Sequence, residues 1–261
     1  MRVNMIGRLT RKAQKLLARI ALGSGRECLL CGNRVGRFLP YRDGWRAAPP
    51  LMRALRVVGS DLDNYLCPAC GCNDRERHLA LYFRELGLFE KVRGSAVLHF
   101  APEPRFGPLI EQAGPASYVR ADLTPTAPGI ERIDMLAIPY VEGRFDFVIA
   151  NHVMEHVADD TKALSELCRV LRPGGLAILQ TPFSNVLDHT ISDPGVTARE
   201  TRLQLYGQED HVRLYGRDIF ASFTAAGFVS RVVRHDQALP AVDAKRYGVN
   251  PDEPLFLFER C

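Results

Sequence analysis

The chain has 261 residues with 46% hydrophobic and 25% charged side chains, a composition typical of a globular protein with a buried core and not of a disordered one. Its formal net charge is +4, but every charged residue in 1–26 is Arg or Lys and the rest is slightly acidic, so bulk charge gives no argument for nucleic-acid binding. No run of about 18 apolar residues occurs and the N-terminus lacks the apolar core of a secretory leader, so a transmembrane helix is excluded and a cytoplasmic location is expected.

Residues 1–25 are predicted to form a basic amphipathic helix that ends in a Gly-Ser-Gly hinge at 23–25. The apolar stripe within 5–20 consists of Ile6, Leu9, Ala13, Leu16, Leu17 and Ile20. Such a helix allows a reversible peripheral membrane contact through residues 1–22. The alternative is a terminal helix that packs on the domain or frays in solution.

Residues 26–75 are predicted to form a zinc-ribbon-like module, because they contain two Cys-x-x-Cys pairs and too few apolar residues for a core of their own. The paired cysteines are Cys28, Cys31, Cys67 and Cys70. In a reducing compartment this spacing is typical of the thiolate ligands of one structural zinc ion rather than of disulfides. Residues 32–66, which separate the two Cys-x-x-Cys pairs, form a longer connection than usual, but the entropic cost of closing a loop increases only slowly with its length. Cys72 and His78 are nearby substitutes that we rank below the paired four.

From Glu76 onward, helix-like and strand-like segments alternate, and we assign 76–261 to one main domain. Strands are predicted at 96–100, 117–121, 130–133, 145–150, 176–180, 228–234 and 255–258. Helices are predicted at 76–94, 105–113, 161–171 and 218–226. Because the strands are continuously apolar and separated by helices, the expected fold class is α/β, a Rossmann-like doubly wound sheet that is mostly parallel with an antiparallel last strand.

In an open parallel sheet, ligands bind beyond the carboxyl ends of the strands, so the residues at these ends are the candidates for cofactor contact. In chain order they are His99, Phe100, Ala101 and Glu103, then Asp122 and Leu123, then Asp134 and Met135, and finally Asn151. Asp122 can accept two hydrogen bonds from a ribose diol, and Asp134 lies where an adenine amine could donate. The sequence therefore predicts a nucleoside-type cofactor at this edge.

The stretch from Phe145 to Gly175 contains Phe-Asp-Phe-Val-Ile-Ala-Asn-His-Val-Met-Glu-His-Val and, at the end of the following helix, Arg-Val-Leu-Arg-Pro-Gly-Gly. In this it resembles the class I S-adenosylmethionine-dependent methyltransferases, in particular those of methyltransferase type 11. The similarity extends over about 94–235. It implies that S-adenosylmethionine is the cofactor, with its ribose at Asp122, its adenine at Asp134 and Met135, and its methionine part at Asn151.

The turn after the first strand departs from the family, which usually has a Gly-rich sequence there. This chain has Ala-Pro-Glu-Pro at 101–104, and Gly follows only at Gly107. We expect Glu103 in this turn to bind the amino group of the cofactor.

Methyl transfer requires in-line alignment of the two reactants and a base where the acceptor carries a proton. His152 and His211 are the candidate bases, and Arg213 and Tyr215 are the candidate acceptor contacts. The set His152, Glu155, His156 and His211 also resembles the metal site of small-RNA 2′-hydroxyl methyltransferases, with His152 in place of the first Glu. The alternative is a helix start with a hydrogen-bonded histidine, as in family members without a metal.

The expected function is a methyltransferase for a small molecule or glycan, because the body is not basic and the connection 182–216 is long and polar. One alternative is an RNA methyltransferase that uses the arginines of 26–75 to hold RNA. Another is a non-catalytic zinc-ribbon interaction protein in which the cofactor domain serves as a scaffold.

Overall fold

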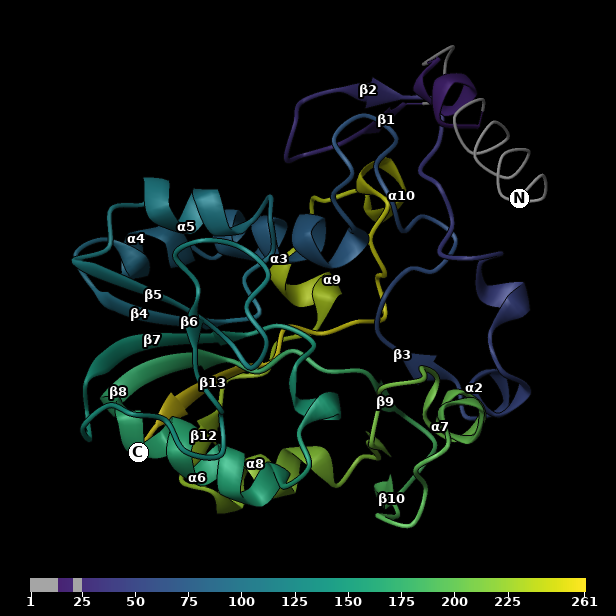
Figure 1. Cartoon of the computed structure of the whole chain (residues 1–261). Helices are drawn as coiled ribbons and strands as arrows, with labels where there is room; N and C mark the ends of the chain where they lie inside the picture. The colour runs from purple at the N-terminus through teal and green to yellow at the C-terminus, as the bar shows by residue number, and fades with distance from the viewer. Residues whose placement is uncertain (1–13, 21–24) are drawn as a thin grey trace.

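The computed structural model describes residues 14–20 and 25–261 and centres on a seven-stranded sheet (Figure 1). The strands lie in the order β12-β13-β8-β7-β4-β5-β6. Their bounds are β4 Ala96–Phe100, β5 Ser117–Asp122, β6 Glu131–Arg132, β7 Phe145–Ala150, β8 Leu171–Ile178, β12 Phe228–Ser230 and β13 Leu257–Arg260. β13 is antiparallel to β8 and β12, and the other pairs are parallel. This topology confirms the expected Rossmann-like sheet with an antiparallel last strand.

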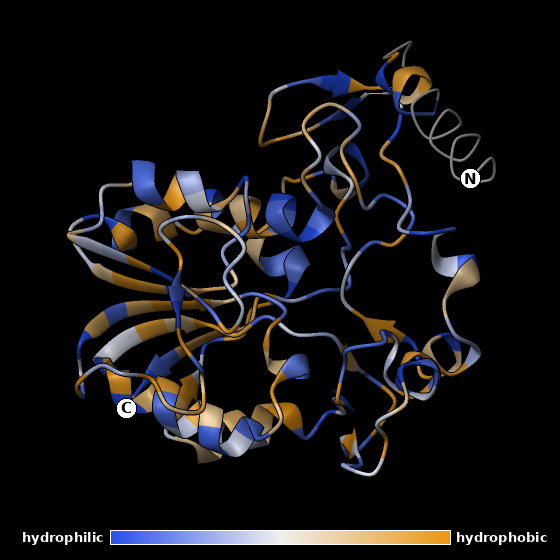
Figure 2. Cartoon of the chain, viewed as in Figure 1, coloured by the Kyte–Doolittle hydropathy of each residue, from blue (hydrophilic) through white to orange (hydrophobic). Residues whose placement is uncertain are grey.

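Helices cover both faces of the sheet (Figure 1). The bounds are α3 Asp74–Glu85, α4 Leu88–Val92, α5 Gly107–Gln112 and α9 His235–Ala238 on one face, and α6 Asp160–Val170 and α8 Ile219–Ala225 on the other. Each face has its own apolar cluster: Phe83 of α3 packs with Phe147, and Leu167 of α6 with Val148. In Figure 2 the strands are mostly hydrophobic, whereas the helices that cover them also carry hydrophilic residues, as expected for a buried sheet.

Some boundaries differ from the sequence prediction for identifiable reasons. The expected helix 76–94 is divided into α3 and α4 at Gly87, whose φ of 65° lies in the left-handed region. Its start is fixed at Asn73, whose side chain accepts from Glu76 N in a capping box. β8 begins at Leu171 instead of 176, directly after α6. A further helix, α7 (Arg199–Tyr206), lies in the connection after β8, where none was predicted.

The segment 26–75 is joined to the main domain. It contains β1 Arg26–Glu27, β2 Arg34–Val35, η1 Trp45–Ala47, α2 Pro50–Ala54 and β3 Val57–Val58. β3 pairs with β9 (Phe183–Ser184) of the connection after β8. In addition, Arg246 of α10 (Ala244–Tyr247) lies 2.6 Å from Glu27. The division of the chain at residues 25 and 75 therefore stays a prediction.

The N-terminal helix packs on this segment where it is described. Residues 14–19 are helical, whereas 1–13 and 21–24 of the predicted helix and hinge lie outside the described residues. Gly36 N donates to Ala18 O at 2.8 Å, and Arg19 Nε donates to Pro68 O at 3.1 Å. These contacts agree with the packed alternative, and the membrane contact stays a prediction. Across 14–20 and 25–261, no helix is long and apolar enough to cross a bilayer.

Candidate cofactor and acceptor site

The carboxyl ends of β4, β5 and β7 meet at one edge of the sheet. Phe100 in β4 is paired with Ala121 on one side and Ala150 on the other, so the residues that follow these strands are neighbours. Two residues at this edge, Ala101 and His152, have positive φ angles of 47° and 56°. Residues other than glycine rarely adopt this conformation, and it occurs preferentially at functional sites.

Glu103 is held at this edge by His99 of β4 and by Asn151, which directly follows β7. His99 Nε2 lies 3.1 Å from Glu103 Oε2, and Asn151 Nδ2 donates to Glu103 Oε1 at 2.5 Å. Burial favours the neutral acid, but the hydrogen bonds and charge of His99, together with the bond from Asn151, outweigh it and lower the pKa of Glu103. The carboxylate is therefore ionised, as required of a group that binds an ammonium.

Asp122 and Asp134 each offer one carboxylate oxygen. Asp122 Oδ1 accepts from Thr124 N at 2.8 Å and Asp134 Oδ1 accepts from Leu136 N at 2.9 Å, whereas neither Oδ2 has a hydrogen-bond partner among the described residues. Leu123, next to Asp122, leaves 56% of its surface exposed and can cover an apolar ring. The remaining predicted contacts, His99, Phe100 and Met135, have buried side chains, so toward a ligand they offer backbone groups.

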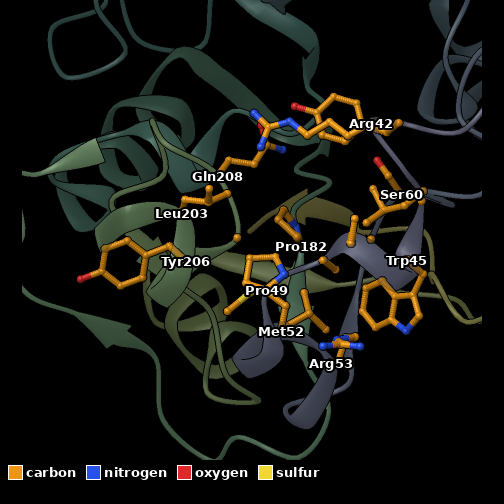
Figure 3. Close-up of a pocket in the computed structure, with 18 of the residues that line it drawn as sticks. Arg42, Trp45, Pro49, Met52, Arg53, Ser60, Pro182, Leu203, Tyr206 and Gln208 are labelled. Carbon is orange, nitrogen blue, oxygen red and sulfur yellow. The ribbon is translucent and has the colours of Figure 1, made fainter. Parts of the chain in front are cut away.

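A cavity of about 390 Å³ opens beside this edge (Figure 3). One wall comes from the segment after β2 and includes Trp45, Met52 and Arg53, and the opposite wall comes from α7 and includes Leu203 and Tyr206. The two predicted bases, His152 and His211, also line it. The sequence indicated the wall from 182–216 but not the wall from the N-terminal segment.

A family model described as "Methyltransferase domain" matches residues 111–179. An uncharacterized methyltransferase of Mycolicibacterium gilvum (strain PYR-GCK) is 31% identical over 164 residues, which are 59% of this chain and 60% of the relative. A second one, from Mycobacterium sp. (strain JLS), is 34% identical over 140 residues, 49% of each chain. The chain thus spans about half to three fifths of these curated relatives. Residues 111–179 are therefore similar to methyltransferase domains.

Among solved structures, the chain is similar to an S-adenosylmethionine dependent methyltransferase from Mesorhizobium loti. The TM-score is 0.45 and the sequence identity 18%, and the match covers 68% of this chain and 96% of the other.

At the edge of the sheet, His152 lies between two buried carboxylates. Its Nδ1 lies 3.3 Å from Glu155 Oε1 and its Nε2 lies 3.2 Å from Glu253 Oε1. Burial and the nearby Arg75 oppose protonation, but Glu155 and Glu253 outweigh them and raise the pKa of His152. Because both of its ring nitrogens face carboxylates, His152 suits a positioning role better than that of a free base. Glu253 was not among the predicted site residues, because it lies far along the chain in a segment without a motif.

A second histidine pair extends from Glu253. His78 Nδ1 lies 3.1 Å from Glu253 Oε2, and His78 Nε2 lies 2.8 Å from His235 Nδ1. His78 is therefore committed to this chain of hydrogen bonds and is not a substitute ligand in the cysteine cluster.

His235 predicts a pH dependence of stability. Burial and the neighbouring His78 outweigh the charges of Asp236, Glu253 and Asp252 and lower its pKa to about 4. The imidazole of His235 takes up a proton near pH 6.5 in the unfolded chain but only near pH 4 in the folded protein. The free energy of unfolding is therefore unaffected by this group above pH 6.5 and decreases as the pH falls from 6.5 toward 4. Replacing His235 with Gln should reduce the loss of unfolding free energy between pH 7 and pH 4.5 by about 1–2 kcal/mol, measured by urea denaturation.

Comparison with the wild-type protein isolates the effect of His235 on the free energy of unfolding. Asp74, a carboxyl whose burial raises its pKa to about 7, titrates in the same range but is present in both proteins and cancels. Parallel pH profiles of His235→Gln and wild type would contradict the assignment.

Arg213 and Tyr215 do not contact the cavity, which corrects their prediction as acceptor contacts. The Arg213 guanidinium donates to the carbonyls of Met154, Val157 and Ala158 at 3.1, 2.7 and 2.9 Å, and the Tyr215 hydroxyl donates to Asp160 at 2.9 Å. Both side chains are buried. Their polar groups hold the turn after β7 instead of facing a ligand.

The cysteine cluster differs from the predicted set in one member. The sulfur atoms of Cys28, Cys67, Cys70 and Cys72 all lie within 4.8 Å of one another, whereas Cys31 is outside this group. The Cys28 and Cys72 sulfurs are 3.4 Å apart. Gly71, with a φ of 81°, reverses the chain so that Cys72 O accepts from Cys67 N at 2.8 Å, which brings Cys72 back to the cluster.

Proposed function

We propose that this chain is an S-adenosylmethionine-dependent methyltransferase that acts on a small molecule or glycan. The observation that carries the proposal is the position of His152. It directly follows Asn151 at the cofactor edge, and it lines the cavity. A cofactor held at this edge would therefore present its methyl group to an acceptor in the cavity.

The residues at the edge fit the parts of this cofactor. The free oxygen of Asp122 suits a ribose hydroxyl, and the ionised carboxylate of Glu103 suits the ammonium of the methionine part. S-adenosylmethionine, when bound, supplies a methyl group on a positively charged sulfur. The chain would hold and orient it, and the two walls of the cavity would exclude water from the acceptor.

The cavity favours a small acceptor. Its volume of about 390 Å³ falls in the range of small-molecule sites. Trp45 offers an aromatic surface, and Arg46 and Arg53 make no ion pair among the described residues, so they are available to an acidic or hydroxyl-bearing acceptor.

We further propose that the cluster of Cys28, Cys67, Cys70 and Cys72 holds a structural zinc ion. Four thiolates in one compact group are a donor set that zinc prefers, and they leave no coordination position for a substrate.

Radiolabelled methyl transfer to separated pools of small molecules, polysaccharide and RNA tests the function. We expect label in the small-molecule or polysaccharide pool, and at least a tenfold loss with Leu203→Trp, because the larger side chain fills the cavity. Val186→Trp, at an exposed position of the same connection, is the matched control and should keep wild-type transfer. Label confined to RNA, or equal transfer by both variants, would contradict this acceptor site.

A further inference from the structure

Glu155, His156 and His211 form a second group of metal-ligand type, distinct from the cysteine cluster. One ligand atom of each lies within 4.8 Å of the others. Glu155 and His156 belong to η2 (Met154–His156), the turn after β7, and His211 lies in the connection between α7 and β11 (Arg213–Leu214). Two segments more than 50 residues apart therefore converge on one point.

The hydrogen bonds of the two histidines fix which nitrogen faces this point. His211 Nδ1 lies 2.9 Å from Tyr206 O, and His156 Nδ1 lies 3.3 Å from Asp210 O. Because a carbonyl oxygen only accepts, each Nδ1 carries the proton, and the Nε2 of each neutral ring has a free lone pair. This is the arrangement that orients histidine ligands around metals.

Both Nε2 atoms face the same carboxylate oxygen. His156 Nε2 and His211 Nε2 each lie 4.0 Å from Glu155 Oε1. Glu155 Oε1 and His211 Nε2 are buried and have no hydrogen-bond partner, although His152 Nδ1 lies 3.3 Å from that oxygen as an ion pair. The second carboxylate oxygen is fixed, since Thr181 Oγ1 donates to it at 2.8 Å. Three acceptors thus converge without a donor among them, an arrangement that a cation would satisfy.

We propose that Glu155, His156 and His211 bind a divalent first-row metal ion at the edge of the cavity. Two imidazoles and one carboxylate suit zinc, iron or cobalt. Each histidine Nε2 lies 4.0 Å from Glu155 Oε1. Two ligand atoms on the same metal ion lie closer to each other by less than about 1 Å, so small side-chain movements complete the site. Three protein ligands leave coordination positions open. Because His211 lines the cavity, these positions can take an oxygen atom of the acceptor, a role that rests on the proposed function.

Cobalt titration of the full-length protein loaded with one equivalent of zinc, which the four thiolates take up, tests the site, with Co²⁺ alone as the probe. We expect one equivalent to bind with weak d–d absorption and no thiolate charge-transfer band, since the cysteines are occupied. His156→Ala should weaken this binding at least tenfold, and His156 is partly exposed, so the variant should fold. His189→Ala, at an exposed histidine outside the site, is the control and should bind as wild type does.

Titration of S-adenosylmethionine in parallel separates the two proposals. No cobalt bound by the protein whose thiolates hold zinc, or equal binding by His156→Ala and His189→Ala, would overturn the metal site even if the cofactor binds. Cobalt binding that depends on His156, without cofactor binding, would support the metal site and contradict the proposed function.

Discussion

Cys67→Ser should reduce the zinc content from about one ion per chain to near zero and unfold the segment around the cysteines. The buried apolar cluster of this segment consists of Cys28, Val35, Phe38, Cys67 and Cys72, so most of it is made of the cysteines themselves. So small a core does not stabilise a fold, and a structural zinc ion contributes roughly 10 kcal/mol or more to modules of this kind. Zinc analysis and limited proteolysis measure the two effects.

The same variant separates the cofactor site from the acceptor site. The segment that carries Trp45 and Met52 forms one wall of the cavity, whereas the cofactor edge belongs to the sheet. Cys67→Ser should therefore lose methyl transfer and retain cofactor binding. Cys72→Ser should behave like it, and Cys31→Ser should retain zinc. Cys168→Ser, outside the cluster, is the control, and full zinc content in Cys67→Ser would contradict the assignment.

Arg77→Ala should lower the free energy of unfolding by about 3–5 kcal/mol. Arg77 is fully buried in α3, and its guanidinium lies 4.0 Å from the centre of the Phe38 ring. It donates to five carbonyl oxygens, those of Asn64, Tyr65, Cys72, Tyr247 and Gly248. These acceptors come from the cysteine segment and from the C-terminal region, so the alanine separates the two regions and leaves four of the carbonyls without a donor among the described residues. Only Cys72 O keeps a hydrogen bond, from Cys67 N.

Urea denaturation measures this effect. Arg77→Lys should lose less, because it keeps the charge but cannot reach all the carbonyls with one ammonium group. Arg84→Ala, at an exposed position of the same helix, should change stability by less than about 0.5 kcal/mol. A loss below about 1 kcal/mol in Arg77→Ala would show that the carbonyls find other partners, contrary to this account.

Much of the sheet could be predicted from the sequence because its signals are local. The strand 145–150 coincides with β7, and the helix 161–171 is shifted by one residue from α6, since both patterns are strongly apolar and have clear ends. Errors occur where one residue determines the backbone. Gly87 interrupts an apolar pattern that continues through it, and periodicity alone does not reveal such a break.

The part of the candidate site that lies at the carboxyl ends of the parallel strands could be predicted from the sequence, because ligands bind there in open parallel sheets. Asp122 ends β5, and Glu103 and Asn151 follow β4 and β7, so the register of the sheet brings the three residues to one edge. Contacts between distant segments were not predictable. Glu253 reaches His152 across 101 positions, and the wall formed by Trp45 depends on the pairing of β3 with β9. Arg213 was misinterpreted because its carbonyl partners are assembled only by the fold.

The binding of S-adenosylmethionine, measured by isothermal titration calorimetry, tests the central claim most directly. We expect wild-type protein to bind the cofactor and its demethylated product with micromolar affinity. Asp122→Ala should weaken both at least tenfold, because it removes charged hydrogen bonds to the ribose. Asp188→Ala, an exposed aspartate outside the cofactor edge, should bind as wild type does. No binding by the wild-type protein, or equal affinity of Asp122→Ala and Asp188→Ala, would contradict a cofactor site at this edge of the sheet.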